Sequence, residues 1–236
     1  MMLKIKILMM ALSMNVFAAT QNFSTLSLEE KYDHFVSLGV PATPLEDTFN
    51  YYDNNLDLFS NQRYVSIIDY SQNSRNKRFY IMDMETGELQ REYVAHGSGR
   101  NRLGFPVADI NHDGMLDRCM HSKFSRKLRL VKHRRWGMTR PGFIRVDGTY
   151  HSSKFAYGEY KRTKAANALL LNGLEASSSD VRRNAVVIHE ASYVYDKPVR
   201  QGRTLGCPAV AQGVVKRFIN KLKGGSLLYS YVPQCK

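Results

Sequence analysis

The chain has 236 residues, with 34 lysines and arginines against 21 aspartates and glutamates and a formal charge of +13. This length buries one good core, so we expect one main domain with a small appended segment. The charge favours an anionic polymer or an anionic lipid surface as partner. We do not expect nucleic acid, because no nucleic-acid motif and no interleaved aromatic residues accompany the basic side chains.

The first residues have the pattern of a secretory signal peptide. Two lysines precede an apolar run from Ile7 to Phe17, which Ala18 and Ala19 follow. The run is too short to span a bilayer with these flanks, and nothing later in the sequence is long enough. We therefore expect residues 1–19 to be removed and the mature chain to be exported, to the periplasm or cell envelope. A retained N-terminal anchor is the alternative.

Residues 20–62 are predicted to form a short N-terminal helical segment. Ser27 is a plausible N-cap with Glu30 three residues later, and Leu38 and Gly39 end this helix. A second short helix is expected over residues 44–52.

A meander of short strands is predicted to follow. Residues 64–70, 78–84 and 89–95 are rich in β-forming side chains and are separated by polar turns. Short strands with such turns favour antiparallel pairing.

Residues 99–148 are interpreted as an inserted basic subregion. Within it, oxygen-bearing side chains have the spacing of a calcium loop, although the twelfth position is Met120 where an EF-hand has glutamate. The alternative is a turn in which these side chains cap their own backbone. A dense basic run at 123–135 follows, and the alternation in residues 127–131 predicts a strand with one solvated face. Contact of this run with an anionic glycan or with peptide carboxylates is the alternative. The calcium candidates are Asp109, Asn111, Asp113 and Asp117.

The C-terminal part is predicted to alternate apolar elements and turns. Residues 165–174 form an apolar element, 185–188 a buried strand and 226–232 a last strand. Apolar residues at near-helical spacing predict a helix over 209–222. The fold class is therefore mostly β with some α, that is, α+β.

Cys207 and His189 are the residues whose pattern points to chemistry. A histidine ending an apolar strand and a cysteine between glycine and proline are the residue types of thiol acyl transfer. A helix starting after Cys207 would lower the pKa of its thiol. Gly202 and Gly206 are expected to turn the backbone so that amides face a developing oxyanion. Glu190 is expected to be exposed.

Three cysteines leave an odd one in an oxidising compartment. The economical arrangement pairs Cys119 with Cys235 and leaves Cys207 reduced. Three free thiols are the alternative.

The same residues carry a family resemblance. His189, fourteen residues, and then Thr204-Leu-Gly-Cys207 resembles the signature of the YkuD-type L,D-transpeptidases, in the branch with a Gly-Arg-Ser/Thr-x-Gly-Cys-Pro-Ala core. Further blocks follow in the family's order: Tyr64-Val-Ser-Ile-Ile-Asp-Tyr-Ser, Arg78-Phe-Tyr-Ile-Met-Asp, Val94-Ala-His-Gly-Ser-Gly, Leu169-Leu-Leu-Asn-Gly-Leu-Glu and Lys223-Gly-Gly-Ser-Leu-Leu-Tyr. The resemblance implies a β-sandwich catalytic domain over residues 63–236.

The resemblance also implies roles. Cys207 would be the nucleophile and His189 the general base, oriented by a backbone carbonyl, while Thr204 shapes the loop with Gly206. The family often has an arginine two residues after the cysteine, where this chain has an alanine, so Arg203 is expected to bind a substrate carboxylate. The weaker candidates for the cleft wall are Tyr193, His151 and His96.

The implied activity is L,D-transpeptidation of peptidoglycan stem peptides, with no cofactor required. The calcium considered above would be structural. A thioester would form at the L-centre of a diamino acid, and an amine would then accept the acyl group. An L,D-carboxypeptidase that hydrolyses the same bond and a non-catalytic wall-binding protein are the alternatives. Neither the acyl acceptor nor the oligomeric state follows from the sequence.

Overall fold

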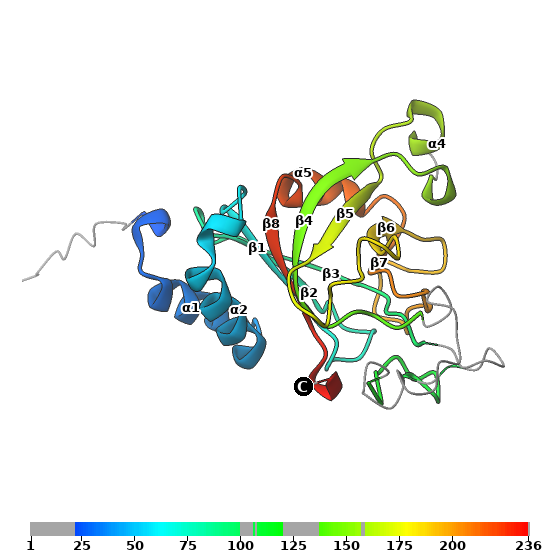
Figure 1. Cartoon of the computed structure of the whole chain (residues 1–236), viewed down its shortest axis with the longest axis horizontal. Coiled ribbons are helices and arrows are strands. Elements are labelled where there is room, and N and C mark those ends of the chain that lie inside the picture. The colour runs from blue at the N-terminus through cyan, green and yellow to red at the C-terminus, as the bar shows by residue number, and fades with distance from the viewer. Residues whose placement is uncertain (1–21, 100–105, 107, 120–136, 157–158, 236) are drawn as a thin grey trace, which may run out of the picture.

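The computed structural model describes residues 22–99, 106, 108–119, 137–156 and 159–235 (Figure 1). The signal peptide expected at 1–19 and the basic run at 123–135, with its expected strand, lie outside the described residues. The strands are β1 (Tyr64–Asp69), β2 (Phe79–Asp83), β3 (Leu89–Glu92), β4 (Gly142–Tyr150), β5 (Ala168–Gly173), β6 (Val187–Glu190), β7 (Ala209–Val210) and β8 (Ser226–Tyr231). The α-helices are α1 (Leu28–Ser37), α2 (Ala42–Asn54), α4 (Glu159–Thr163) and α5 (Ile219–Leu222).

The N-terminal helices form as predicted. The Ser27 hydroxyl accepts from the amide of Glu30 at 3.2 Å, and the Glu30 carboxylate accepts from the amide of Ser27 at 2.8 Å, which is a complete capping box. The helix ends at Ser37 with Leu38 as its C-cap, and the next residue, Gly39, takes a φ of +84°.

The strands formed by the described residues make one eight-stranded sheet in the order β3-β2-β1-β8-β4-β5-β6-β7. The expected meander β1-β2-β3 is antiparallel, with Ile67 opposite Tyr80 and Tyr80 opposite Arg91. Two pairs are parallel: β1 with β8, and β6 with β7. The prediction of a mostly β chain with some α is confirmed.

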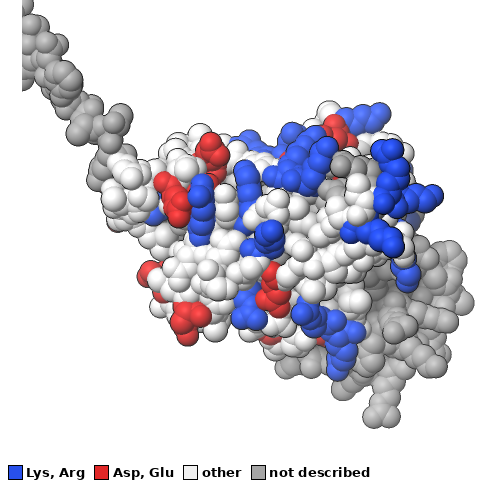
Figure 2. Space-filling view, turned by 90° about the horizontal axis from the view of Figure 1, so that it is seen from above, with Lys and Arg blue, Asp and Glu red and all other residues white. Residues whose placement is uncertain are grey.

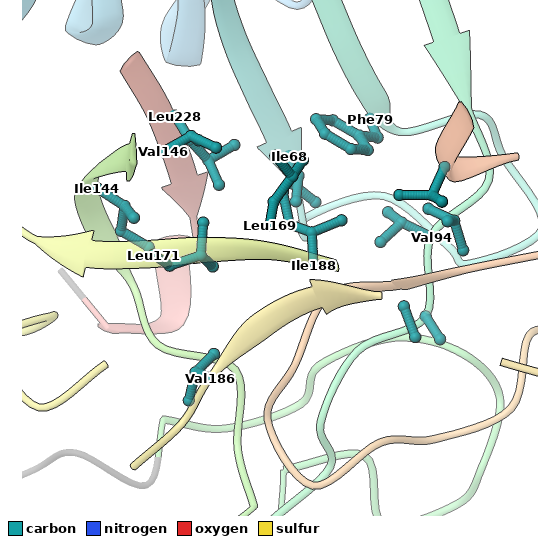
Figure 3. Close-up of a cluster of buried hydrophobic side chains, with 14 of the residues drawn as sticks. Ile68, Phe79, Val94, Ile144, Val146, Leu169, Leu171, Val186, Ile188 and Leu228 are labelled. Atoms are coloured by element: carbon teal, nitrogen blue, oxygen red, sulfur yellow. The ribbon is translucent and has the colours of Figure 1, made fainter. Parts of the chain in front are cut away.

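The sheet curves until its two halves face each other. The chain after β3 meets β7 at the opposite edge, where Ala95 and Ala209 form an antiparallel bridge and the Ala95 amide donates to the Ala209 carbonyl at 2.8 Å. Ile68 and Phe79 from one half pack in the same buried cluster as Leu169 and Ile188 from the other (Figure 3). The expected sandwich is thus made by one sheet folded over its core.

The N-terminal helices cover the other face of the first half of the sheet (Figure 1). A second buried cluster joins Phe35 of α1 and Leu45 of α2 to Ile67 of β1 and Leu227 of β8. Cys207 and His189 are not part of this cluster, so the helices cover the face of the sheet that does not carry the candidate site. In the described part of the chain, no helix is both long enough and apolar enough to cross a membrane.

The prediction of a helix over residues 209–222 is wrong for the first half of that range. Ala209 and Val210 form β7, and only the short turn η5 (Val215–Arg217) and α5 are helical. Pairing with β6 decides the conformation of the first two residues, because the sheet supplies their backbone partners. Gly213, with a φ of +78°, then separates the strand from the turns.

Candidate active site

Cys207 lies in a loop whose shape is set by Thr204. The Thr204 hydroxyl donates to the Cys207 carbonyl at 2.7 Å and accepts from the Gly206 amide at 3.1 Å. Gly206 has a φ of +110°, a conformation that favours glycine. Cys207 itself is a half-buried free thiol, with Sγ 3.9 Å from the carbonyl oxygen of Ala185 just before β6. The loop-shaping role expected for Thr204 agrees with these contacts.

The loop that carries Cys207 crosses the segment around Gly97 at very short range. A Cβ placed on Gly97 would lie 2.1 Å from the carbonyl oxygen of Gly137 and 2.5 Å from the Cα of Gly206. The Thr204 amide donates to the carbonyl of His96 at 2.9 Å, so the same segment also bonds the loop. Only glycine at position 97 permits this approach of three backbones.

His189 is delivered by β6 to the neighbourhood of the cysteine. Its amide donates to the carbonyl of Pro208 at 3.2 Å, and it stands in parallel register with Ala209. Its Nδ1 lies 2.7 Å from the carbonyl oxygen of Glu190. Because a carbonyl only accepts, Nδ1 must carry the proton, which leaves Nε2 with a free lone pair as a neutral base.

Burial keeps both candidate catalytic groups neutral. It lowers the pKa of His189 below its usual 6.5, against the opposing effect of the Glu190 carbonyl. The ring of Phe155 in η4 (Ser153–Phe155) stacks on the imidazole at 3.7 Å between centroids and 16° between planes. Burial also raises the pKa of the Cys207 thiol. The expected lowering by a helix dipole is therefore wrong, since no helix starts at this residue.

Tyr150 is a site residue that the sequence interpretation missed. In the sheet, Tyr150 of β4 stands opposite Ala168 of β5, and Ala168 stands opposite His189 of β6. Residues directly opposite share a face, so Tyr150 and His189 flank the small Ala168. Charge on Cys207 adds to the burial that raises the pKa of the Tyr150 hydroxyl. The register between strands, which the sequence does not reveal, decides this placement.

Glu190 is buried, and the expectation that it is exposed is wrong. Its Oε1 accepts from the amide of Val215 at 3.2 Å, and burial raises its pKa. Its side chain thus serves the turn after β7, while its backbone carbonyl orients His189.

His96 cannot line the cleft, because its side chain is fully buried. Nη2 of Arg78 lies 2.8 Å from Nδ1 of His96, and Nε2 of His96 lies 3.1 Å from Oδ2 of Asp109. Arg78 only donates, so the proton of the neutral ring is on Nε2 and points to the carboxylate. Burial lowers the pKa of His96 to about 4. The imidazole is a structural link between three chain segments.

The three other residues expected to contact substrate, Arg203, Tyr193 and His151, each contact other parts of the protein. Arg203 is half-buried, and its charge acts on Asp109 and His96. Tyr193 is 40% exposed and packs beside Gly202, whose amide donates to the Tyr193 carbonyl at 3.1 Å. His151 directs Nδ1 to the carbonyl of Ala165 at 2.9 Å.

The two backbone amides expected to form an oxyanion hole, those of Gly202 and Gly206, already donate hydrogen bonds within the protein. The amide of Gly206 donates to Thr204 and that of Gly202 to Tyr193. Among the described residues, the Cys207 amide in this turn has no acceptor.

The loop considered for calcium bonds mainly to its own backbone. The Asn111 side chain accepts from the amide of Asp113 at 3.1 Å, Asp113 from the amide of Met115 at 2.8 Å, and Asp117 from the amide of Ile110 at 2.9 Å. Asp109 is turned to His96. The described residues contain no cluster of three acidic, histidine or cysteine side chains suited to a metal ion. These contacts agree with the self-capped turn, and calcium stays an untested prediction.

The two other cysteines form a disulfide. Cys119 and Cys235 have Cα atoms 4.9 Å apart and are separated by 116 residues. Both pack against the main buried cluster. The pairing expected from the sequence is present and leaves Cys207 reduced.

A family model described as the L,D-transpeptidase catalytic domain (YkuD_2) matches residues 39–112 and 139–231, well over half of the chain. The chain belongs to this family. The L,D-transpeptidase match is interrupted over residues 113–138, within the region interpreted as an insertion.

Two solved structures are similar to this L,D-transpeptidase family member at low identity. One, the Bd1075 protein of Bdellovibrio bacteriovorus, is 14% identical with a TM-score of 0.37, and the match covers 75% of this chain and 50% of that one. The other, the L,D-transpeptidase of Xylanimonas cellulosilytica, is 15% identical with a TM-score of 0.34 and coverages of 71% and 60%. The chain thus spans about half to three fifths of their lengths. No curated protein matches it.

Proposed function

We propose that the protein is an exported, cysteine-dependent L,D-transpeptidase acting on peptidoglycan stem peptides. The observation that carries this proposal is the orientation of His189. Its Nδ1–H is held by the Glu190 carbonyl, its Nε2 is free to accept a proton, and its strand is bonded to the residue after the free cysteine. Membership in the L,D-transpeptidase catalytic domain family supports the substrate class.

Acyl transfer would proceed in two steps. In the first, Sγ of Cys207 attacks the carbonyl carbon at the L-centre, and His189 Nε2 takes the thiol proton. The carbon–nitrogen bond to the terminal D-residue breaks, and His189 gives the proton to the leaving amine. In the second, a side-chain amine of another stem attacks the thioester carbonyl carbon and loses a proton to His189. The carbon–sulfur bond breaks, His189 returns the proton to Sγ of Cys207, and the new amide is the cross-link.

The neutral pair described above fits such a proton-coupled attack. A buried thiol with a raised pKa needs a base within reach, and a buried imidazole with a lowered pKa is unprotonated at neutral pH. The Cys207 amide is the proposed donor to the tetrahedral oxyanion.

Export and the wall as partner rest on separate observations. The leader-like residues 1–19 indicate secretion, and the Cys119–Cys235 disulfide is compatible with an oxidising compartment. Figure 2 shows one face on which lysine and arginine side chains spread over the body of the molecule, while acidic side chains are fewer. A positive surface favours approach to an anionic envelope.

Incubation with disaccharide tetrapeptides and mass spectrometry of the products tests the proposal. We expect joined dimers from the wild-type protein and none from Cys207→Ala. Tripeptides alone would instead identify an L,D-carboxypeptidase, and unchanged substrate a wall-binding protein. Activity that persists in Cys207→Ala would refute the assignment of Cys207 as the nucleophile.

A further inference from the structure

Arg140 is a buried cation with a fixed position close to the cysteine loop. Only 4% of its side chain is exposed. Its Nε and Nη2 donate to the two carboxylate oxygens of Asp180 at 2.7 and 3.1 Å, and its Nη1 donates to the carbonyl of Met138 at 2.7 Å. A guanidinium held by three such bonds has no rotational freedom to exchange partners.

The anchor of Arg140 touches the turn that presents the nucleophile. The carbonyl oxygen of Met138 lies 2.9 Å from the position that a Cβ on Gly206 would occupy. Met138 also forms an antiparallel β-bridge with Ser98, which follows Gly97 in the segment that crosses the cysteine loop. Arg140 is therefore one carbonyl away from the backbone of residue 206, directly before Cys207.

Five groups bear on the ionisation of the thiol. His189 lies on β6, Tyr150 on β4 and Tyr70 just after β1, and all three are neutral near pH 7, since burial raises the pKa of both tyrosines and lowers that of His189. Burial raises the pKa of Cys207, the backbone amide of Val187 opposes this most strongly, and the positive charge of Arg140 opposes it next. Arg203, the cation expected from the sequence, acts instead on the Asp109 and His96 pair.

We propose that Arg140, fixed by Asp180 and Met138, is a positioning residue whose charge stabilises the thiolate of Cys207 as it forms. It acts through the field at Sγ and through the Met138 carbonyl that supports the loop, without contacting substrate. Asp180 has two opposing effects: it holds the guanidinium in place and partly neutralises its charge. The inference deepens the proposed function, on which the role of Cys207 rests.

Alkylation of Cys207 by iodoacetamide tests this inference without any turnover. Because Cys119 and Cys235 are bridged, Cys207 is the free thiol, and only its thiolate reacts. The rate is measured against pH, by mass spectrometry, for the wild type, Arg140→Gln, Arg140→Lys and Asp180→Asn. Arg182→Gln removes the same charge from a half-exposed position two residues after Asp180 and serves as the matched control.

The inference predicts opposite shifts for the two partners. Arg140→Gln should move the midpoint of alkylation upward by about one pH unit, which is about tenfold slower reaction below it. Arg140→Lys keeps the charge and should fall between Arg140→Gln and the wild type. Asp180→Asn keeps an amide oxygen as acceptor for Nε and leaves the bond from Nη1 to Met138, so the guanidinium stays in place. The midpoint should then move downward, because the charge of Arg140 is less compensated. Arg182→Gln should behave as the wild type.

Two results would overturn the inference. One is an Arg140→Gln profile that overlies those of the wild type and Arg182→Gln in folded protein, checked by melting temperature. The other, which remains available if Arg140→Gln does not fold, is an unchanged or raised midpoint in Asp180→Asn. Neither depends on transpeptidation, so failure of the proposed function would be seen separately, as normal alkylation without cross-linked product.

Discussion

The amide of His189 donates to the carbonyl of Pro208 at 3.2 Å, so the strand that carries the proposed base is hydrogen-bonded to the residue after the proposed nucleophile. The relative placement of base and thiol is thus a property of the backbone. Changing either side chain should therefore alter the chemistry while leaving the loop in place, which makes single substitutions at this site informative.

His189→Gln should lower the rate of acyl transfer by about 10²–10⁴-fold, because no group then accepts the thiol proton. In the wild type, activity should be lost as pH falls and Nε2 becomes protonated. Burial lowers the pKa of this imidazole, so the half-maximal point should lie below pH 6.5. His34→Gln, on α1 and bonded to the Gly87 carbonyl, is the matched control and should keep wild-type activity. A half-maximal point above 6.5 would contradict a buried neutral base.

Gly97→Ala should disrupt the cysteine loop. The added methyl would meet backbone atoms of Gly137 and Gly206 at 2.1–2.5 Å, and backbone cannot yield as a flexible side chain does. We expect a loss of at least about 2 kcal/mol in the free energy of unfolding, together with loss of activity. Gly148→Ala is the control, since its methyl would meet only the Leu170 side chain at 3.8 Å. Equal denaturation midpoints for the two variants would show that the backbones at Gly97, Gly137 and Gly206 do not approach each other as closely as described.

His96 should make stability depend on pH in the acid range. Its folded pKa of about 4 lies below the usual 6.5, so its stabilising contribution is complete above pH 6.5 and is lost as pH falls toward 4. The linkage amounts to about 3 kcal/mol over this window. Urea unfolding at several pH values should show this slope in the wild type and a flatter one in His96→Gln. An unchanged slope in the variant would assign the effect to other groups.

Reduction of the Cys119–Cys235 bridge should destabilise the fold without removing the nucleophile. A link across 116 residues contributes about 3–5 kcal/mol by restricting the unfolded chain. The double variant Cys119→Ser/Cys235→Ser should therefore melt roughly 10 °C lower. Non-reducing peptide mapping of the wild type should find these two residues joined and Cys207 free. A bridge that includes Cys207 would contradict the account.

The sequence predicts the elements of this fold better than their contacts. The capping box at Ser27, the meander and the last strand follow from local pattern, because period and turn chemistry are local. The helix expected at 209–222 fails because pairing of Ala209 with β6 outweighs apolar spacing that also suits short turns.

The candidate site shows the same limit. Cys207, His189 and Thr204 are identifiable from spacing and residue type. Tyr150 depends on strand register, and Arg140 depends on its pairing with Asp180, forty residues away. His96 looks like a cleft histidine in the sequence and is buried only because Arg78 and Asp109 converge on it. Such convergence of distant segments leaves no local signal.

Peptide mapping of the protein after reaction with a carbapenem-type β-lactam or a stem tetrapeptide tests the central claim most directly. The account predicts an acyl adduct on the peptide that contains Cys207, present in the wild type, absent in Cys207→Ala and strongly slowed in His189→Gln. An adduct on any other residue would contradict this account. So would cross-linked product that forms while Cys207 stays unmodified, or that still forms in Cys207→Ala.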